Sequence, residues 1–308
     1  MRMAATFAFV LALVVALVAP VHAQTDNERI LRFDSDIVVN PDVTVDVTET
    51  IEVLAAGNRI RRGIFRDFPT IYEDRFGNRV RVGFDVVSVS RNGQPEPYAI
   101  ERLANGVLVR IGQADVFLDP GRYVYRIAYR TDRQLGFFED FDELYWNVTG
   151  NGWEFIIDRA KAVVRLPGDA PLAQYEAYTG RQGERGRNFS VSDTLGRITF
   201  ETNTRLLPEE GLTIAVAWPK GYVTPPGPVD ALGYFLRDNA GAAIALFGTL
   251  IVAAVYLFMW WRVGRDPESG TVIPRFAPPE GLSPAATRFI RRMGYDRQAY
   301  SAAIISMA

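Results

Sequence analysis

The sequence predicts a mainly β protein with an antiparallel β-sandwich ectodomain, a single transmembrane α-helix and a short helical cytoplasmic segment. Three observations lead to this fold class. Residues 25–230 contain many short runs in which apolar and polar residues alternate, with Gly, Pro, Asn and Asp between the runs. The same region contains no clear amphipathic helix of ordinary length. Residues 240–261 are apolar and uncharged over a length that can cross a bilayer.

The composition excludes several kinds of chemistry. No cysteine is present, which excludes thiol catalysis, disulfide bonds and thiolate metal sites. The one histidine, His22, lies in the predicted signal peptide, so the mature chain can form neither a Ser-His-Asp triad nor an imidazole metal site. The net charge of -2 argues against a nucleic-acid-binding protein. We therefore expect no cofactor, no metal and no nucleic-acid partner.

Residues 1–23 have the three parts of a secretory signal peptide. Arg2 supplies the positive start, residues 4–18 are apolar apart from Thr6, and Val21 and Ala23 fit a small-residue cleavage site. An apolar run of about 15 residues is short for a membrane span, so cleavage is favoured over an uncleaved anchor.

Alternating residues predict the strands of the β domain, residues 24–222. Residues 43–53 alternate with one break at Glu49, which is expected to mark a strand end or a bulge. From Val87 the alternation that begins at Val80 shifts by one residue, as a β-bulge would cause, and Asn92-Gly93 then predicts a hairpin. Sheets with one polar face need a second apolar surface, which a sandwich supplies. Further alternating runs cover residues 123–130, 160–166, 198–200 and 212–218.

A Pro-rich linker and membrane approach, residues 223–239, is predicted between the β domain and the membrane. Three of the residues from Val223 to Pro228 are prolines. Because proline fixes φ and lacks an N–H, we expect this stretch to be extended and largely unpaired.

Residues 240–261 are predicted to span the membrane. About 22 residues at about 1.5 Å each reach about 33 Å, and Trp260 and Trp261 suit the headgroup region. A core helix is the alternative, but the uncharged length and the flanking aromatics argue against it. Arg262 and Arg265 follow, so the C-terminal flank is expected on the cytoplasmic side. We therefore expect the chain to lie in the cell (inner or plasma) membrane.

The cytoplasmic segment, residues 262–308, is predicted to hold two short helices. The first begins at Ser283 and Pro284 and continues to about Met293, with Gly294 as its C′ residue, and the second starts near Tyr295. The segment has too little apolar surface for an independent core, so we expect it to be part of a longer domain.

The first candidate binding cluster is the arginine segment, Asn58 to Pro69. Guanidinium groups could pair with phosphate or carboxylate, which would make the segment an anion site. The alternative, which we favour, is a loop whose arginines form structural ion pairs with neighbouring acids. The candidate residues are Arg59, Arg61, Arg62 and Arg66.

The second candidate cluster is the acidic segment, Phe137 to Asn147. Its carboxylates could bind Ca²⁺ or supply an acid/base pair, but the spacing is not that of a calcium loop. The aromatic neighbours favour a loop that buries its rings and exposes its acids. The candidates are Glu139, Asp140, Asp142 and Glu143, and we assign no catalytic residue.

Four ordered features resemble one family of bacterial predicted membrane proteins, grouped as "domain of unknown function 2207" (YciQ-like). They are the signal peptide, Arg59–Pro69, Leu144–Asn147 followed by Gly150–Trp153, and Trp260–Pro267. The resemblance implies an extracytoplasmic β domain, a transmembrane helix and a cytoplasmic part that usually continues through further membrane helices. It implies no activity and no catalytic residues.

Three functions follow as hypotheses. The leading one is a non-catalytic envelope protein that is anchored in the lipid bilayer and whose β domain binds an envelope protein or polymer. The second is a carboxylate-dependent glycan hydrolase of the cell envelope. The third is an ectodomain sensor with a cytoplasmic output. The sequence predicts no oligomeric state.

Overall fold

The computed structural model describes residues 28–73, 77–194, 196–265, 270–271 and 279–308. The predicted signal peptide, 1–23, lies outside the described residues. The chain divides into two compact units, Met1–Ala243 and Ile244–Ala308, and each is described by itself.

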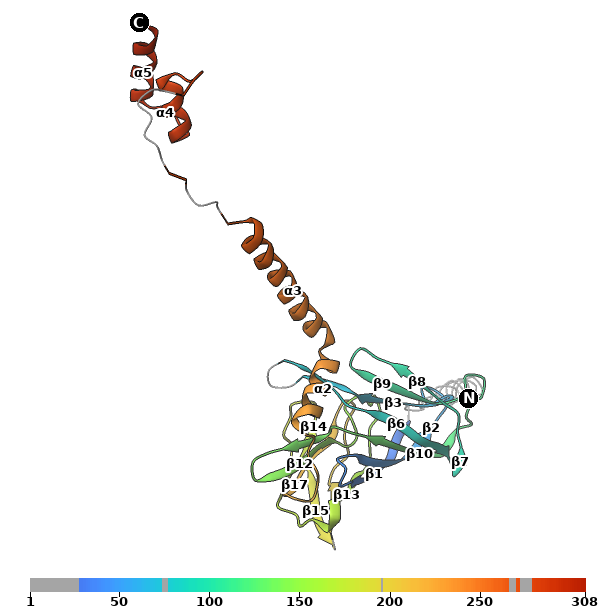
Figure 1. Cartoon of the computed structure of the whole chain (residues 1–308). Coiled ribbons are helices and arrows are strands. Elements are labelled where there is room, and N and C mark those ends of the chain that lie inside the picture. Colours follow the sequence, from blue (N-terminus) through green and yellow to red (C-terminus); the bar gives the residue numbers. More distant parts are fainter. Residues whose placement is uncertain (1–27, 74–76, 195, 266–269, 272–278) are drawn as a thin grey trace, which may run out of the picture. The chain divides into compact units, whose positions relative to one another are not determined.

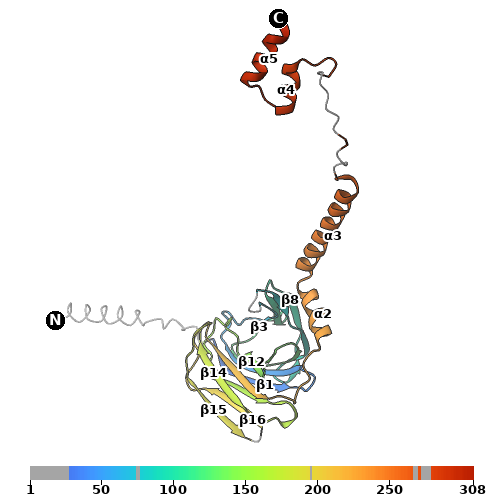
Figure 2. The ribbon, with the colours of Figure 1, turned by 60° about the vertical axis from the view of Figure 1, so that its left-hand side comes forward.

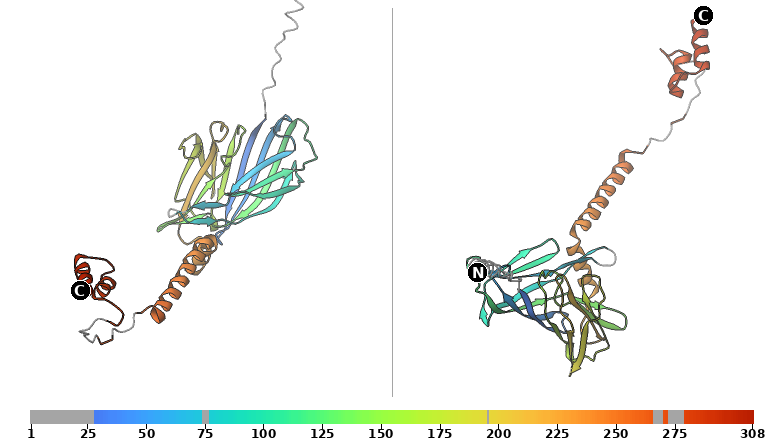
Figure 3. Two further views of the ribbon diagram at one scale, coloured as in Figure 1. Left: turned by 90° about the horizontal axis from the view of Figure 1, so that it is seen from above. Right: turned by 180° about the vertical axis from the view of Figure 1, so that it is seen from behind.

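The first unit is mainly β and contains several sheets, as predicted (Figures 1, 2 and 3). The largest sheet, in spatial order, consists of β15 (Phe189–Thr194), β16 (Arg197–Thr202), β13 (Ala160–Arg165), β1 (Arg29–Val39), β2 (Val45–Ala55), β10 (Gly121–Thr131), β6 (Phe84–Arg91) and β7 (Gln94–Pro95). A four-stranded sheet consists of β11 (Leu135–Phe137), β12 (Phe141–Asn147), β17 (Gly211–Pro219) and β14 (Gln174–Gly180). The smaller sheets are β3 (Gly63–Pro69), β9 (Gly106–Gly112) and β8 (Tyr98–Arg102), and the pair β4 (Ile71–Glu73) and β5 (Arg79–Arg81).

One strand pair corrects the prediction of a purely antiparallel domain. β1 pairs with β13 in parallel, whereas the other strand pairs within the described residues are antiparallel. A parallel pair needs a long connection, and the whole stretch from β2 to β12 separates these two strands. Local alternation cannot show such a pairing, because it reports the faces of a strand and not its neighbours.

The predicted bulge and hairpin are confirmed. The register between β10 and β6 shifts between Ala128 and Tyr129, where Ser88 and Val86 are the partners and Val87 is the extra residue. β6 and β7 then join through Asn92 and Gly93, which have φ values of 52° and 81°. Two consecutive positive φ values are typical of a tight two-residue hairpin turn.

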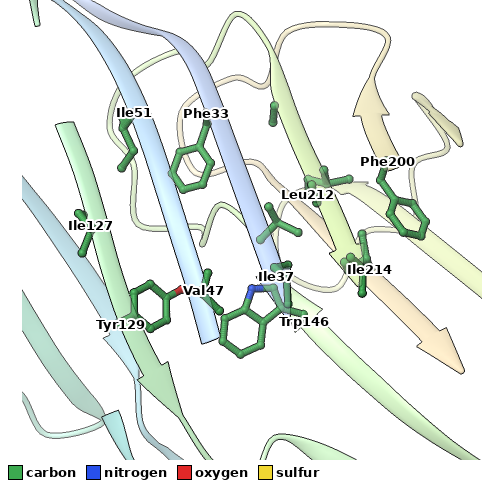
Figure 4. Packing of buried hydrophobic residues seen from close by; sticks show 14 of the residues in the cluster. Phe33, Ile37, Val47, Ile51, Ile127, Tyr129, Trp146, Phe200, Leu212 and Ile214 are labelled. Atoms are coloured by element: carbon green, nitrogen blue, oxygen red, sulfur yellow. The ribbon is translucent and has the colours of Figure 1, made fainter. Parts of the chain in front are cut away.

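Three of the sheets contribute to one hydrophobic core. The cluster includes Phe33 and Ile127 of the eight-stranded sheet, Trp146 and Ile214 of the four-stranded sheet, and Val109 of the three-stranded sheet. Figure 4 shows members of this cluster from the first two sheets. The alternation seen in the sequence therefore places residues of these three sheets in a shared interior.

The Pro-rich stretch starts in the core of the β domain and ends at a helix. Val223 is buried in the core, and the Thr224 N–H donates to the Pro41 carbonyl at 3.2 Å. Helix α2 (Pro228–Asp238) begins at the last proline of the stretch. Proline is favoured at the first position of a helix, because the N–H group that it lacks would have no hydrogen-bond acceptor within the helix there.

Helix α3 (Ala240–Val263) includes the whole predicted span and extends two residues beyond it. By length and composition, this helix is long and apolar enough to cross a membrane. The mean hydropathy of its most apolar 18 residues is 2.4.

The second unit contains helices α4 (Pro284–Arg292) and α5 (Arg297–Met307). Ser283 accepts a hydrogen bond from the Ala286 N–H, which confirms the predicted start of α4. Met293 is the C-cap of α4 and takes the left-handed conformation, with φ of 52°, and Gly294 follows it at the predicted C′ position. The Asp296 carboxylate binds Arg288 of α4 at 2.7 Å, and this contact ties the end of α4 to the start of α5.

Candidate functional site

A buried ion pair lies where the three-stranded and eight-stranded sheets meet. Glu49 is 0% exposed and Arg66 is 3% exposed. Arg66 donates from Nε and Nη2 to the two carboxylate oxygens of Glu49, both at 2.8 Å, and the Tyr129 hydroxyl donates to Glu49 Oε1 at 2.9 Å. The planar fork of arginine suits this two-point contact. We call Glu49, Arg66 and Tyr129 the buried triad.

The triad corrects the interpretation of Glu49. Residues of β2 alternate between buried and half-buried through Glu49 without interruption, and the register with β1 does not shift there. The break in the apolar pattern is therefore neither a strand end nor a bulge but a buried carboxylate. Of the functional signals in the sequence, this break was the one that could have located the triad.

The surroundings of the triad keep Arg66 charged and Tyr129 protonated. Burial alone would lower the pKa of the Arg66 guanidinium, but the adjacent Glu49 carboxylate outweighs burial and raises this pKa. Burial, together with the Glu49 charge, raises the pKa of the Tyr129 hydroxyl well above its ordinary value. The hydroxyl therefore stays protonated and donates to Glu49. The ring of Phe68, 4.4 Å from the guanidinium carbon, covers Arg66 on one side.

The segment that follows β12 closes around Arg66. The Val148 carbonyl accepts from Arg66 Nη2 at 3.3 Å. A Cβ at Gly150 would lie 2.7 Å from Arg66 Nη1, and a Cβ at Gly152 would lie 2.7 Å from the Asp67 carboxylate oxygens. The arginine segment and the Gly150–Trp153 segment, two of the four features that carry the resemblance, therefore pack against each other at the triad.

Glu28 holds the start of the arginine segment in place. Its carboxylate accepts four backbone N–H groups at 2.7 to 3.1 Å. Burial alone would raise the pKa of Glu28, but these hydrogen bonds lower it overall. The donors are Ala56, Asn58, Arg59 and Ile60.

The other arginines of the segment lie at the surface beside aromatic rings. Arg59 forms an ion pair with Glu154 and lies over the Phe155 ring. The guanidinium carbons of Arg61 and Arg62 lie 5.5 and 4.2 Å from the ring centre of Phe117, which is 57% exposed. Within the described part of the chain, neither Arg61 nor Arg62 forms an ion pair. We call Arg61, Arg62 and Phe117 the arginine–aromatic surface.

The structure thus divides the four candidate arginines. Arg59 and Arg66 form structural ion pairs, as the favoured interpretation predicted, although their partners Glu154 and Glu49 are not sequence neighbours. The predicted loop is in part a strand, because residues 63–69 form β3.

The acidic segment follows the prediction only in part. Asp142 is 1% exposed and accepts from Lys220 Nζ at 2.6 Å, whereas the rings of Phe137 and Phe138 are exposed. The reason is that β12 places Asp142, Leu144 and Trp146 on its buried face. Glu139 and Asp140 are exposed in the turn before the strand.

The two central carboxylates of this segment do not face each other. Asp142 and Glu143 are consecutive residues of a strand, so their side chains point to opposite faces of the sheet. Burial raises the pKa of Glu143. An acid/base pair would need both groups to line one cleft and to flank the bond that is cleaved.

The two candidate clusters remain separate in their contacts. Among the residues described, no ion pair joins Arg59, Arg61, Arg62 or Arg66 to a carboxylate of the acidic segment. The described residues also contain no group of three His, Cys, Asp or Glu side chains that could hold a metal ion.

Comparisons with known proteins identify a family and one curated relative. Residues 29–218 match the family model described as "Predicted membrane protein (DUF2207) N-terminal domain". The chain is 26% identical to the uncharacterized protein YciQ of Escherichia coli (strain K12), over 91% of this chain and 44% of YciQ. The chain therefore spans less than half the length of this relative.

Solved structures resemble the chain only distantly. Yeast LTA4 hydrolase in complex with bestatin has a TM-score of 0.41 and 13% identity, over 66% of this chain and 32% of the hydrolase. An M1 zinc metallopeptidase from Deinococcus radiodurans has a TM-score of 0.35 and 14% identity, over 61% of this chain and 42% of the peptidase. At these values, neither likeness informs the function of this chain.

Proposed function

The chain belongs to the DUF2207 family of predicted membrane proteins, and from this membership we propose that it is an envelope protein whose β domain binds a partner outside the cytoplasm. In this proposal, α3 anchors the chain in the cell (inner or plasma) membrane. The β domain lies on the extracytoplasmic side and residues 262–308 lie in the cytoplasm.

The charges that flank α3 support this orientation. Arg262 and Arg265 follow the apolar stretch, whereas on the other side Arg237 is next to Asp238. Basic residues concentrate on the cytoplasmic side of membrane helices. The predicted signal peptide, residues 1–23, favours export of the N-terminal part, in agreement with the flanking charges.

We further propose that the sheets of the β domain pack as a sandwich. The shared core supports this arrangement, because Trp146 and Ile214 of the four-stranded sheet belong to the same cluster as Phe33 and Ile37 of the eight-stranded sheet. Two apolar sheet faces that meet in one core are the defining feature of sandwiches.

One observation carries the binding role. At the arginine–aromatic surface, two guanidinium groups without ion-pair partners in the described structure lie over an exposed Phe117 ring. Arginine and aromatic residues are enriched at protein interfaces, where guanidinium groups bind carboxylates. We therefore propose that an envelope protein or polymer with carboxylates next to apolar groups binds here. Glu28 supports this surface, because it fixes the backbone just before Arg61.

The geometry favours binding over glycan hydrolysis. Asp142 and Glu143 point to opposite faces of β12, and Lys220 already neutralises Asp142. The binding proposal instead uses groups that are exposed and have no carboxylate partner in the described residues.

Capture of partners by the full chain tests the proposal. The protein, purified in detergent from its own membranes, is cross-linked in envelope extract, and partners of wild type are compared with those of the double variant Arg61→Gln, Arg62→Gln. We expect a partner that wild type retains and the double variant loses, with weaker retention at high salt because the contact is ionic.

Arg197→Gln serves as the matched control, since Arg197 is an exposed arginine on a strand of the same unit, at a distance in sequence from the candidate segment. Equal capture by wild type and the double variant would contradict the proposed surface.

A further inference from the structure

Helix α2 is fastened to the β domain along one face. Asp238 Oδ2 accepts from Arg133 Nη2 at 2.7 Å and from the Arg81 N–H at 3.1 Å. The Arg133 guanidinium carbon lies 4.4 Å from the ring centre of Tyr234. Because Tyr234 and Asp238 are four residues apart, they share one face of the helix.

The connection extends into the backbone of β5. Asn239 exchanges two hydrogen bonds with Arg79, accepting from its N–H at 3.0 Å and donating to its carbonyl at 3.1 Å. Burial alone would raise the pKa of Asp238, but the bonds from Arg133 and Arg81 lower it overall, so the carboxylate is charged at neutral pH. The C-terminal end of α2 is therefore held by charge and by backbone bonds.

The opposite face of α2 is apolar and exposed. Val229, Leu232 and Leu236 follow the spacing of one helix face and are 83%, 58% and 39% exposed. At about 100° per residue, this stripe points away from the face that carries Tyr234 and Asp238. A soluble helix would turn such a stripe toward the core, whereas here the polar face takes that place.

The continuity of the chain identifies what covers this stripe. Asn239 is the one residue between the end of α2 and Ala240, the first residue of the candidate span. The 11 residues of α2 extend about 16 Å, so no part of the stripe can lie far from the membrane surface once α3 is inserted. Arg79 and Arg81, at the same end of α2, are exposed cations that suit anionic headgroups.

We propose that α2 is an interfacial helix, whose stripe of Val229, Leu232 and Leu236 inserts into the headgroup layer of the bilayer that α3 crosses. This inference rests on the proposed membrane anchoring. Amphipathic helices bind at this depth through their apolar face. Because Tyr234 and Asp238 hold the other face, α2 sets which side of the β domain faces the lipid.

Site-directed spin labelling of the full chain tests this placement. The chain lacks cysteine, so each introduced cysteine is a unique label site. Val229→Cys and Leu232→Cys report on the stripe, Asp230→Cys and Arg237→Cys are the matched controls on α2, and Val252→Cys reports on α3. The chain is placed in vesicles of phosphatidylethanolamine and phosphatidylglycerol. Collisions with lipid-soluble oxygen are then compared with collisions with a water-soluble nickel chelate.

We expect the ratio of oxygen to nickel collisions to be several-fold higher at residues 229 and 232 than at 230 and 237. Equal, water-like ratios at all four α2 sites, with residue 252 in lipid, would overturn the inference and leave the membrane anchor intact. A water-like ratio at residue 252 would instead refute the anchor itself.

Spin–spin broadening at residue 232 that disappears on dilution with unlabelled chain would assign the stripe to a second copy and likewise overturn the inference. Limited proteolysis confirms that each labelled chain keeps its β domain, and Leu236→Cys replaces any stripe variant that does not fold.

Discussion

At the scale of single residues, the buried triad holds a carboxylate and a guanidinium out of contact with water. A carboxylate removed from water is costly unless it is paired and hydrogen-bonded. Glu49 meets both conditions through two bonds from Arg66 and one from Tyr129. Removal of one partner would leave the other as an uncompensated buried charge.

We predict that Glu49→Ala lowers the free energy of unfolding by about 3–5 kcal/mol, the range for breaking a buried ion pair. The double variant Glu49→Leu, Arg66→Met should cost less than the sum of the two single changes, because it removes both charges together. Urea unfolding of the full chain in detergent, followed by tryptophan fluorescence, measures both.

Glu52→Ala is the matched control for this prediction. Glu52 lies on the same strand and pairs with the exposed Arg122 at 3.5 Å, so its loss should cost less than about 1 kcal/mol. A similar small cost for Glu49→Ala would show that the triad contributes little to stability.

Glu28 gives the domain a pH dependence of defined sign. Its pKa is lower in the folded chain than in the unfolded chain. The stabilisation is therefore complete above the ordinary glutamate pKa of about 4.3 and is lost as the pH falls through the lowered folded value.

We predict that Glu28→Gln lowers the free energy of unfolding by about 1–3 kcal/mol at pH 7, since four N–H donors lose a charged acceptor. The difference from wild type should shrink as the pH is lowered below about 4. Urea unfolding at several pH values tests this. A difference that grows toward acid pH would contradict a lowered pKa for Glu28 in the folded chain.

At the scale of elements, the segment after β12 must approach Arg66 closely. Gly150 has φ of 73°, and the space beside it is occupied by the guanidinium that Glu49 holds. A glycine is required there both for its backbone conformation and for lack of room.

We predict that Gly150→Ala lowers the free energy of unfolding by about 2–4 kcal/mol, from left-handed backbone strain plus overpacking against Arg66. Gly183→Ala is the matched control, because Gly183 has φ of 90° but open space around its Cβ position. It should cost only about 1–2 kcal/mol. Thermal unfolding of both variants in the same detergent provides the comparison, and equal costs would mean that Arg66 yields to the new methyl group.

At the scale of the whole molecule, the proposal depends on which side of the membrane each part occupies. Reporters that are active only in the cytoplasm or only outside it can be fused after residue 222 and after residue 265. We predict extracytoplasmic activity at the first site and cytoplasmic activity at the second, because the arginines after α3 remain inside. The same compartment at both sites would refute the membrane anchor.

Local features of this protein were predictable from the sequence. The strands of the β domain, the bulge at Val87, the Asn92-Gly93 hairpin and the start of α4 at Ser283 depend on neighbouring residues, and the structure confirms each. The sequence predicted the structure least well where a charged side chain occupies a buried position of its strand. Glu49 on β2 broke the apolar pattern and Asp142 on β12 was expected to be exposed, because the partners that bury them, Arg66 and Lys220, lie elsewhere in the chain.

The β character of residues 28–222 and the apolar helix that follows could be predicted from the order of residues, since periodicity and length suffice for both. Other features became visible only in the folded chain: β1 lies parallel to β13, Glu49 meets Arg66 beside Gly150, and Asp238 fastens α2 to β5. These contacts join residues 17 or more positions apart in the sequence. Local propensities encode neither such contacts nor the order of strands in a sheet.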